Sequence, residues 1–563
     1  DWHGSRDHLG RVAFLRNPRN PSDTSAFSLA SGESFGEFSY PFPINENYAL
    51  VSDKDSILIM DDKGHIFQDI KIPADFSAEL KKRRLEIKNP VPIKKSQKGE
   101  IAADTADYDE EDATVSVVDA AIGRNMGNIK SSDIKKLLIS EILPLACHLT
   151  GGMEPITMLG TFSLERPLGT VNVEEDGSAH FKVPANRALS FTALDAEGKA
   201  IKKMQSFVNF APGTTTSCIG CHEQRDMAPP PIMHKLKALR RPADKLAPIP
   251  GVKCGEVPDF VRDIQPLLDK YCTECHNPQK YSGKIDLTPG MGPMFARSYY
   301  ELYMADQIVD GFNRNGNMPP YQFGSGSSKL LKKFEGKHHA KRATDEELNL
   351  VKVWLDTGAL HAGSIAAAES GMLGSYYLNR FVNRDAGWKE IAEMNDVFKK
   401  NCASCHSGQK RLPNMISKDS REQLNWHFTF YVKGKNDPRR RLSAGAVFNL
   451  TYPENSAVLN APLSAKAGGR AGDGQHPVIF TSRDDSRYQT ILKAINKAKN
   501  YVETQNPRYD SPNYKPKGAY LKAMKRYGII KGDNFENFNA FECDKKYWDK
   551  VTAPKPYKCM QDL

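Results

Sequence analysis

Six of the ten cysteines in this 563-residue sequence form three pairs with two residues between the partners, and a histidine follows each pair directly. The overall frequencies of Cys and His predict roughly 0.004 such pentapeptides by chance in a chain of this length. Two thiols at this spacing can form thioether bonds to the two vinyl groups of one haem, and the adjacent imidazole can ligate the iron. The spacing therefore predicts three covalently bound haem c groups. The residues of the three motifs are Cys218, Cys221 and His222; Cys272, Cys275 and His276; Cys402, Cys405 and His406.

Two other uses of paired cysteines fit the sequence less well. A zinc ribbon places its second pair about 15 to 20 residues after the first, whereas the intervals here are 51 residues (272 − 221) and 127 residues (402 − 275). A thioredoxin-like redox motif needs one pair after a strand in a βαβ pattern, and no such pattern surrounds these pairs. Neither use explains a histidine after every pair.

Covalent haem attachment takes place on the outer side of an energy-transducing membrane. We therefore expect an exported protein, in the periplasm or another extracytoplasmic compartment, whose signal peptide has been removed. In an oxidising compartment the four remaining cysteines can form two disulfides. Cys543 and Cys559 are the favoured pair because they share one short segment, and Cys147 with Cys254 follows by elimination.

Composition and charge narrow the class of partner. Apolar residues make up 39% and charged residues 26% of the chain, which excludes general disorder, and no apolar run is long enough to span a membrane. The net charge of +10 does not predict nucleic-acid binding, because the basic residues are dispersed and no nucleic-acid motif is present. Haem propionates would offset about six of these charges. We expect redox partner proteins, and other cytochrome subunits or self-association.

The second and third motifs lie in segments 264–280 and 394–410, which align without a gap at an offset of 130 residues. In both, an amphipathic helix ends where the motif begins, as in small class-I-like cytochromes c. Segments 343–358 and 487–505 are predicted to be later helices that close the two haem pockets, and Thr344 with Glu347 forms a capping box. The first motif instead follows a loop, 211–217, after strand-like sequence.

These patterns predict a multidomain α+β fold, in which an N-terminal β-rich region, propeller-remnant and β-sandwich-like, precedes two mainly α-helical cytochrome c domains. The expected divisions are a β-rich propeller-like remnant at 1–76, a charged linker at 77–130, a β-rich haem domain at 131–253, cytochrome c domains at 254–365 and 366–540, and a tail at 541–563 with a possible disulfide.

The stretch GTVNVEEDGSAHFKVPANRALSFTALDAEGKAIKKMQSFVNFAPGTTTSCIGCHEQRDMAPP resembles the middle domain of hydrazine synthase alpha-subunit-like multihaem cytochromes. PPYQFGSGSSKLLKKFEGKHHAKRATDEE, NLTYPENSAVLNAPLSAKAGG and MKRYGII are similar to the same family. The resemblance implies that residues 27–73 are the last strands of a β-propeller. It also implies, in a true synthase, a tyrosine iron ligand four residues after the first motif histidine, and a zinc ion facing that histidine. In this sequence that position is Asp226, which departs from the family pattern. Hydrazine synthesis and a zinc ion near the first haem are therefore expectations that rest on the resemblance alone.

Each haem also needs an assignment of its second axial position. For the second haem we favour His338, which matches a family histidine position, over Met318 in a Met-Pro loop and over His339. The candidates for the third haem are His427 and His476. The candidates for the first haem are His148, His180 and His234. If none of these binds, the first iron is open to a small molecule, with Asp226 and Glu223 as candidate catalytic proton donors.

The leading hypothesis is an exported three-haem c-type cytochrome that transfers electrons, as a subunit of a larger redox complex. The first alternative is a hydrazine-synthase-like oxidoreductase that acts on a small nitrogenous substrate at the first haem. The second alternative is a structural haem subunit of an assembly.

Overall fold

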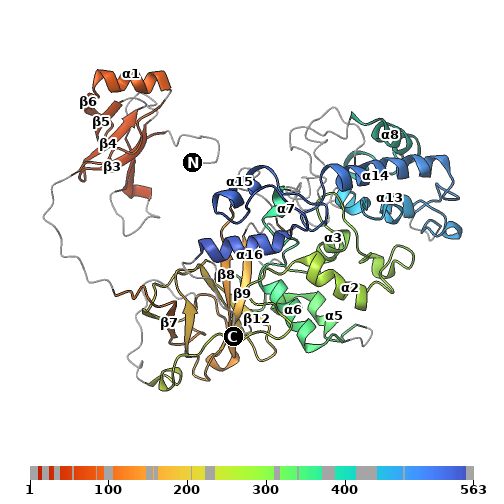
Figure 1. The fold of residues 1–563 in the computed structure, drawn as a ribbon, viewed down its shortest axis with the longest axis horizontal. Helices are drawn as coiled ribbons and strands as arrows, with labels where there is room; N and C mark the ends of the chain where they lie inside the picture. The colour runs from red at the N-terminus through yellow and green to blue at the C-terminus, as the bar shows by residue number, and fades with distance from the viewer. Residues whose placement is uncertain are drawn as a thin grey trace. The chain divides into compact units, whose positions relative to one another are not determined.

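The computed structural model divides the chain into two compact units, residues 1–104 and 105–563, which are described separately (Figure 1). The residues that the structure describes are 10–15, 24–30, 38–53, 56–83, 85–93, 105–146, 156–157, 163–204, 206–221, 235–309, 317–338, 342–369, 387–413, 441–472 and 476–552. Within these ranges no helix is long and apolar enough to cross a membrane.

The N-terminal unit contains a four-stranded antiparallel sheet whose strands lie in chain order. Apolar residues alternate on one face, and Val51 and Met60 are almost wholly buried there. The turn between the last two strands is set by Asp61, whose Oδ1 accepts hydrogen bonds from the backbone of Lys63 and His65. The expected β-rich character of residues 27–73 is confirmed. The elements are β1 (Ala13–Leu15), β2 (Phe27–Leu29), β3 (Ser39–Pro43), β4 (Tyr48–Asp53), β5 (Ser56–Asp61), β6 (Ile66–Ile70) and α1 (Ala74–Arg83).

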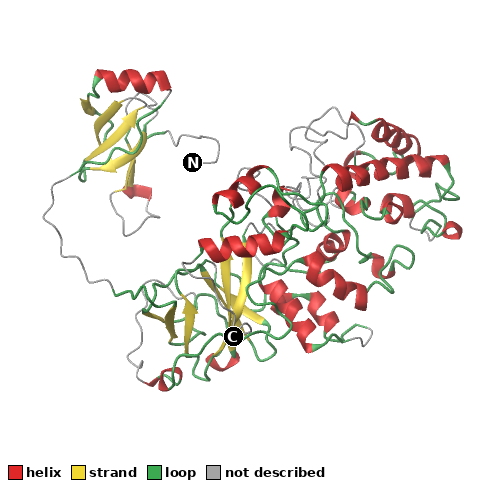
Figure 2. Ribbon diagram, viewed as in Figure 1, coloured by secondary structure: helices red, strands yellow, loops and turns green. Residues whose placement is uncertain are grey.

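The second unit begins with two sheets (Figure 2). They share one apolar core, which includes Val115, Ile139, Phe181 and Phe191. One sheet has the order β12-β11-β8-β9 and is antiparallel throughout. The other has the order β10-β7-β13, in which β13 runs parallel to β7. The strands are β7 (Asp112–Val117), β8 (Lys136–Leu143), β9 (Leu164–Asn172), β10 (Ala179–Pro184), β11 (Leu189–Leu194), β12 (Ala200–Lys203) and β13 (Thr215–Cys218).

Helices and loops follow these sheets and form a second continuous core around Phe260, Trp354, Ile491 and Trp548. The architecture is therefore mixed, with sheet-rich regions first and a helical region after them, as the sequence predicts. The expected capping box of Thr344 is also present. The helices are η5 (Phe260–Ile264), α2 (Gln265–Tyr271), α3 (Arg297–Met304), α4 (Gly324–Ser327), α5 (Lys329–Phe334), α6 (Asp345–Asp356), α7 (Ala366–Glu369), α8 (Lys389–Asn401), α12 (Ala444–Val447), α13 (Ala457–Asn460), α14 (Ser486–Gln505), α15 (Gly518–Arg526) and α16 (Ala540–Val551).

The structure corrects the expectation of a solvated linker across residues 77–130. Strand β7 lies inside this range, is paired on both sides and contributes Ala113, Val115 and Val117 to the sheet core. The acidic run that ends at Asp112 dominates the local composition and hides the apolar alternation that begins one residue later. A central strand needs only about five such residues.

The C-terminal segment also differs from the expected tail. Helix α16 lies against the sheet that contains β8 and β9 (Figure 1), and Trp548 Nε1 donates a hydrogen bond to the carbonyl of Pro144 at 3.2 Å. Cys543 is a free, buried thiol on this helix, so it does not form the expected disulfide with Cys559, a residue outside the described ranges. Cys254 is disulfide-bonded, and its expected partner Cys147 lies outside the described residues.

Candidate functional site

The second and third Cys-x-x-Cys-His motifs continue the last turn of a helix in the same way. After α2, the backbone nitrogen of Cys272 donates to the carbonyl of Leu268 at 2.8 Å, and that of His276 donates to the carbonyl of Cys272 at 3.0 Å. After α8, Cys402 donates to Phe398 at 2.9 Å and His406 to Cys402 at 2.8 Å. The offset of 130 residues seen in the sequence is thus a repeat of local structure.

In each copy a second histidine faces the motif histidine. The ring centroids of His276 and His338 are 5.9 Å apart with an interplanar angle of 25°. Those of His406 and His476 are 6.2 Å apart with an angle of 24°. A metal that binds two imidazoles on opposite sides at about 2.0–2.1 Å each places their centroids roughly 6 Å apart. Within each pair, the separation is the one expected if the two imidazoles were to hold the same iron.

Backbone carbonyls orient the rings. The Nδ1 atom of His276 lies 2.7 Å from the carbonyl of Ser282, that of His406 3.2 Å from Lys410, and that of His476 2.8 Å from Pro477. A carbonyl can only accept a hydrogen bond, so Nδ1 carries the hydrogen and Nε2 keeps its lone pair for a metal.

Burial also affects the protonation of the third motif histidine. Burial is the main cause of the lowered pKa of His406. The lowered pKa favours the neutral imidazole, which is the form that can bind a metal.

Both histidine pairs line one cavity of about 920 Å³. This volume lies near the upper end of the range of about 300–1,000 Å³ that is typical of ligand sites. Apolar side chains such as Leu302, Phe334 and Val458 form much of its wall, and α3 runs along it. Motif cysteines also reach the wall. They are Cys272, Cys402 and Cys405. The apolar wall, the thiols and the facing imidazoles fit a haem at each motif.

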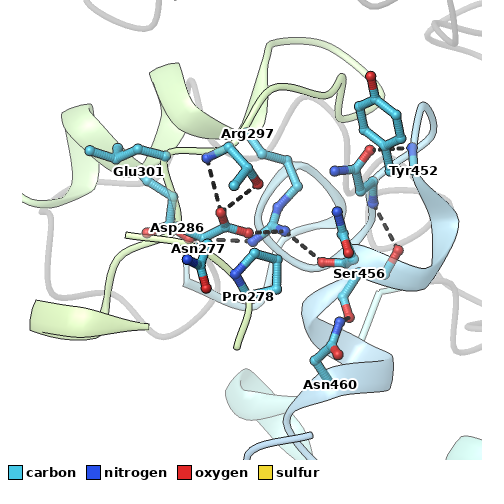
Figure 3. A network of polar contacts seen from close by, with 12 residues as sticks. Asn277, Pro278, Asp286, Arg297, Glu301, Tyr452, Ser456 and Asn460 are labelled. Carbon is cyan, nitrogen blue, oxygen red and sulfur yellow. Dashed lines mark hydrogen bonds and ion pairs between the residues drawn. The ribbon is translucent and has the colours of Figure 1, made fainter. Parts of the chain in front are cut away.

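A polar network fastens the two halves of this cavity to each other (Figure 3). Arg297 on α3 contacts Asp286 (Nη1 to Oδ2, 3.3 Å), and the same nitrogen donates to the carbonyl of Asn455 at 3.0 Å. Asp286 follows the second motif, and Asn455 follows the third. Arg470 adds a second link, because its guanidinium lies 3.9 Å from the ring centroid of Tyr281.

Glu301, one turn after Arg297 on α3, is the acidic side chain among the described residues that line the cavity. Arg297 Nη2 lies 3.5 Å from its Oε1. Burial raises the pKa of Glu301 to about 7, and Arg297 opposes this shift.

The structure separates the candidates for the second and third haems. His338 and His476 face the motif histidines, whereas Met318 is absent from the described cavity lining and its carbonyl accepts a hydrogen bond from Lys202 Nζ at 2.7 Å. The remaining two candidates, His339 and His427, lie outside the described residues.

The first motif is built differently from the other two. Cys218 ends β13, and Cys221 is buried in the sheet core. The turn at 119–123 packs so closely on the motif that a Cβ at Gly220 would lie 2.2 Å from the carbonyl oxygen of Ile122, and one at Gly123 would lie 1.9 Å from that of Cys221. Glycine is therefore required at both positions.

Most of the residues predicted to surround the first haem lie outside the part of the chain that the structure describes. These are His222, Glu223, Asp226, His148 and His234. His180 is paired with Ser116, one register position from the row of Cys218 and Val117, so its side chain lies on the opposite face of the sheet from Cys218. No group of three or more His, Cys, Asp or Glu residues suited to a metal occurs among the described residues.

Sequence reasoning did not anticipate the shared cavity, Glu301 or Lys202. One signal was available for Glu301, because a lone carboxylate among the tyrosines of RSYYELYM is unusual on a buried helix. The shared cavity has no comparable local signal, since its walls come from segments more than 100 residues apart.

Comparison with known proteins agrees with the resemblance noted in the sequence. Residues 109–223 match the family model of the hydrazine synthase alpha subunit middle domain. Hydrazine synthase of Kuenenia stuttgartiensis aligns structurally with a TM-score of 0.40 and 16% identity, over 60% of this chain and 56% of that chain. No curated protein matches. The matched residues include the sheets that carry the first motif, and this part of the chain is similar to the middle domain of hydrazine synthase alpha subunits.

Proposed function

We propose that this chain is an exported three-haem c-type cytochrome that transfers electrons within a hydrazine-synthase-related complex. The observation that carries the proposal is the pair of facing histidines beside each of the second and third motifs, inside one cavity. Each bound haem would supply a one-electron ferric–ferrous couple.

Within the proposal each residue has a definite task. Cys272 with Cys275, and Cys402 with Cys405, would attach the two porphyrins. His276 and His406 would be the proximal ligands. The carbonyls of Ser282 and Lys410 hold Nδ1 of these rings, so Nε2 is the nitrogen that would bind the iron.

His338 and His476 would complete the two ligand sets. A second strong ligand leaves no coordination position for a substrate, and this favours electron transfer over catalysis at these two sites. The near-parallel rings support the same role, because ligands already in place need not move when the iron changes oxidation state.

The test uses the holoprotein. We expect three haems per chain by the pyridine haemochrome assay, and low-spin spectra for the second and third. His338→Ala and His476→Ala should each add one carbon monoxide-binding haem per chain. His65→Ala is the control, because His65 is 70% exposed and lies in the N-terminal unit, and it should add none. If neither cavity variant gains carbon monoxide binding, the proposal is wrong.

A second function is favoured by the family match at residues 109–223, which includes the first motif. This is an oxidoreductase in which a small nitrogenous substrate reacts at the first haem and the other two supply electrons. Wild-type protein that binds one carbon monoxide per three haems would favour it. Three inert low-spin haems would exclude it.

A further inference from the structure

Glu301 sits where charge would change during electron transfer. It lies in the last turn of α3, its side chain is 17% exposed, and it lines the cavity that both histidine pairs share. An ionised carboxylate in a water-poor site is costly unless cations compensate it.

The charged groups around Glu301 come from three segments. Arg297 is on the same helix, Asp286 follows the second motif, and Arg441 and Arg470 lie in the segments after the third motif. Tyr281 is a further titratable neighbour, since Glu301 and Tyr281 interact electrostatically.

Compensation of the Glu301 carboxylate is incomplete. Arg297 is shared between two carboxylates, Asp286 at 3.3 Å and Glu301 at 3.5 Å, and it also serves the carbonyl of Asn455. Arg470 is engaged by the ring of Tyr281 and by the carbonyl of Pro278. A negative charge added to the cavity therefore shifts the balance further toward the neutral carboxyl.

We propose that Glu301 is the proton-binding group coupled to reduction in the shared cavity, an inference that rests on the proposed haem ligation. When a one-electron donor protein delivers an electron to the cavity, the Glu301 carboxylate takes one proton from solvent, and no other bond forms or breaks. On oxidation the electron leaves for an acceptor and the proton returns to solvent. The carboxyl titrates near neutral pH, which suits this exchange.

Coupling of one proton to one electron makes the reduction potential depend on pH. The limiting slope is about 59 mV per pH unit, which is a tenfold change in proton concentration converted for a one-electron couple. The slope appears only between the carboxyl pKa values of the oxidised and reduced states, so a bend near neutral pH is expected.

The experiment is a spectroelectrochemical titration of holoprotein between about pH 5 and pH 9. Wild type should show the slope, and Glu301→Gln, which keeps the shape and an acceptor for Arg297, should lose it. Asp356→Asn is the matched control. Burial also raises the pKa of Asp356 to about 7, but this residue is absent from the described cavity lining, so its variant should keep the slope.

A slope that persists in Glu301→Gln, or potentials that do not vary with pH in wild type, would overturn the inference. If the variant does not load haem, the reduced-minus-oxidised infrared spectrum of wild type decides the matter. Loss of a carboxylate band and gain of a carboxyl band support the inference, and their absence refutes it. Three haems with low-spin spectra but pH-independent potentials would sink this inference and leave the proposed ligation standing.

Discussion

A buried ion cluster joins the last helix to the sheets that carry the first motif. Glu141 on β8 is fully buried, and its Oε2 contacts Arg166 Nε at 2.9 Å and Arg187 Nη1 at 3.1 Å. Arg166 also binds Asp549, and Arg187 donates to Thr552 Oγ1, both at 2.9 Å. Glu141 thus orients the two guanidinium groups that hold the C-terminal end of α16.

Glu141→Gln would leave the two arginines buried with less negative charge. Removing one partner of a buried ion pair costs about 3–5 kcal/mol. In the variant Arg166 still has its contacts with Asp549 and with the carbonyl of Gly255, so mainly Arg187 loses its partner. We therefore expect a loss of stability of about 3 kcal/mol, the lower end of this range. A loss of this size corresponds to a roughly 100-fold rise in local opening.

Hydrogen exchange followed by mass spectrometry measures this opening in α16 directly. Amides of α16 should exchange roughly 100-fold faster in Glu141→Gln than in wild type. Glu175→Gln is the control, because both side chains of the Glu175–Lys237 ion pair are exposed to solvent. This variant should leave the exchange rates of the α16 amides unchanged. An increase of less than about threefold in Glu141→Gln would refute the role assigned to the cluster.

Three further outcomes follow from single contacts. Burial raises the pKa of Asp356 to about 7, so the stability that its neutral carboxyl contributes is complete below about pH 4 and is lost as the pH rises to about 7. The free energy of unfolding should fall by up to about 1.4 kcal/mol per pH unit in this window. Thermal unfolding measured across the window should show this fall in wild type and not in Asp356→Asn. Thr344→Ala removes the hydroxyl that accepts from the backbone of Glu347 at 3.2 Å and should cost about 1 kcal/mol in denaturant unfolding. Lys202→Met leaves the carbonyl of Met318 without its 2.7 Å hydrogen bond and should speed proteolytic cleavage near residue 318, which limited digestion will show.

Local sequence patterns predicted the parts of the site that depend on nearby residues. Helices α2 and α8 end at Tyr271 and Asn401, directly before the motif cysteines, as the amphipathic pattern predicts, because one turn of backbone fixes the motif geometry. The capping box of Thr344 is likewise a contact over three residues. Such features are decided within a single element, so the sequence alone is sufficient.

Features that depend on distant segments were missed for a physical reason. Strand β7 is central because β10, which begins at Ala179, and β13, which begins at Thr215, pair with it from much later in the chain. Helix α16 is buried because its Trp548 and Asp549 meet Pro144 and Arg166, about 400 residues earlier. The local sequence of β7 or α16 does not predict which segment packs against it, since an amphipathic pattern indicates only that one face will be covered by apolar surface.

The facing histidines are an intermediate case, because the repeat contains the information. His338 follows its motif histidine by 62 residues (338 − 276), and His476 follows by 70 (476 − 406), whereas His427 follows by 21 (427 − 406). In the first copy the wall helix α3 comes between the motif and the facing histidine, and in the second copy α12 and α13 hold the same place. A ligand at 427 would precede the wall and break this order. The repeat therefore favours His476 over His427 from chain order alone, because in each copy the helices that line the cavity come before the histidine that faces the motif histidine.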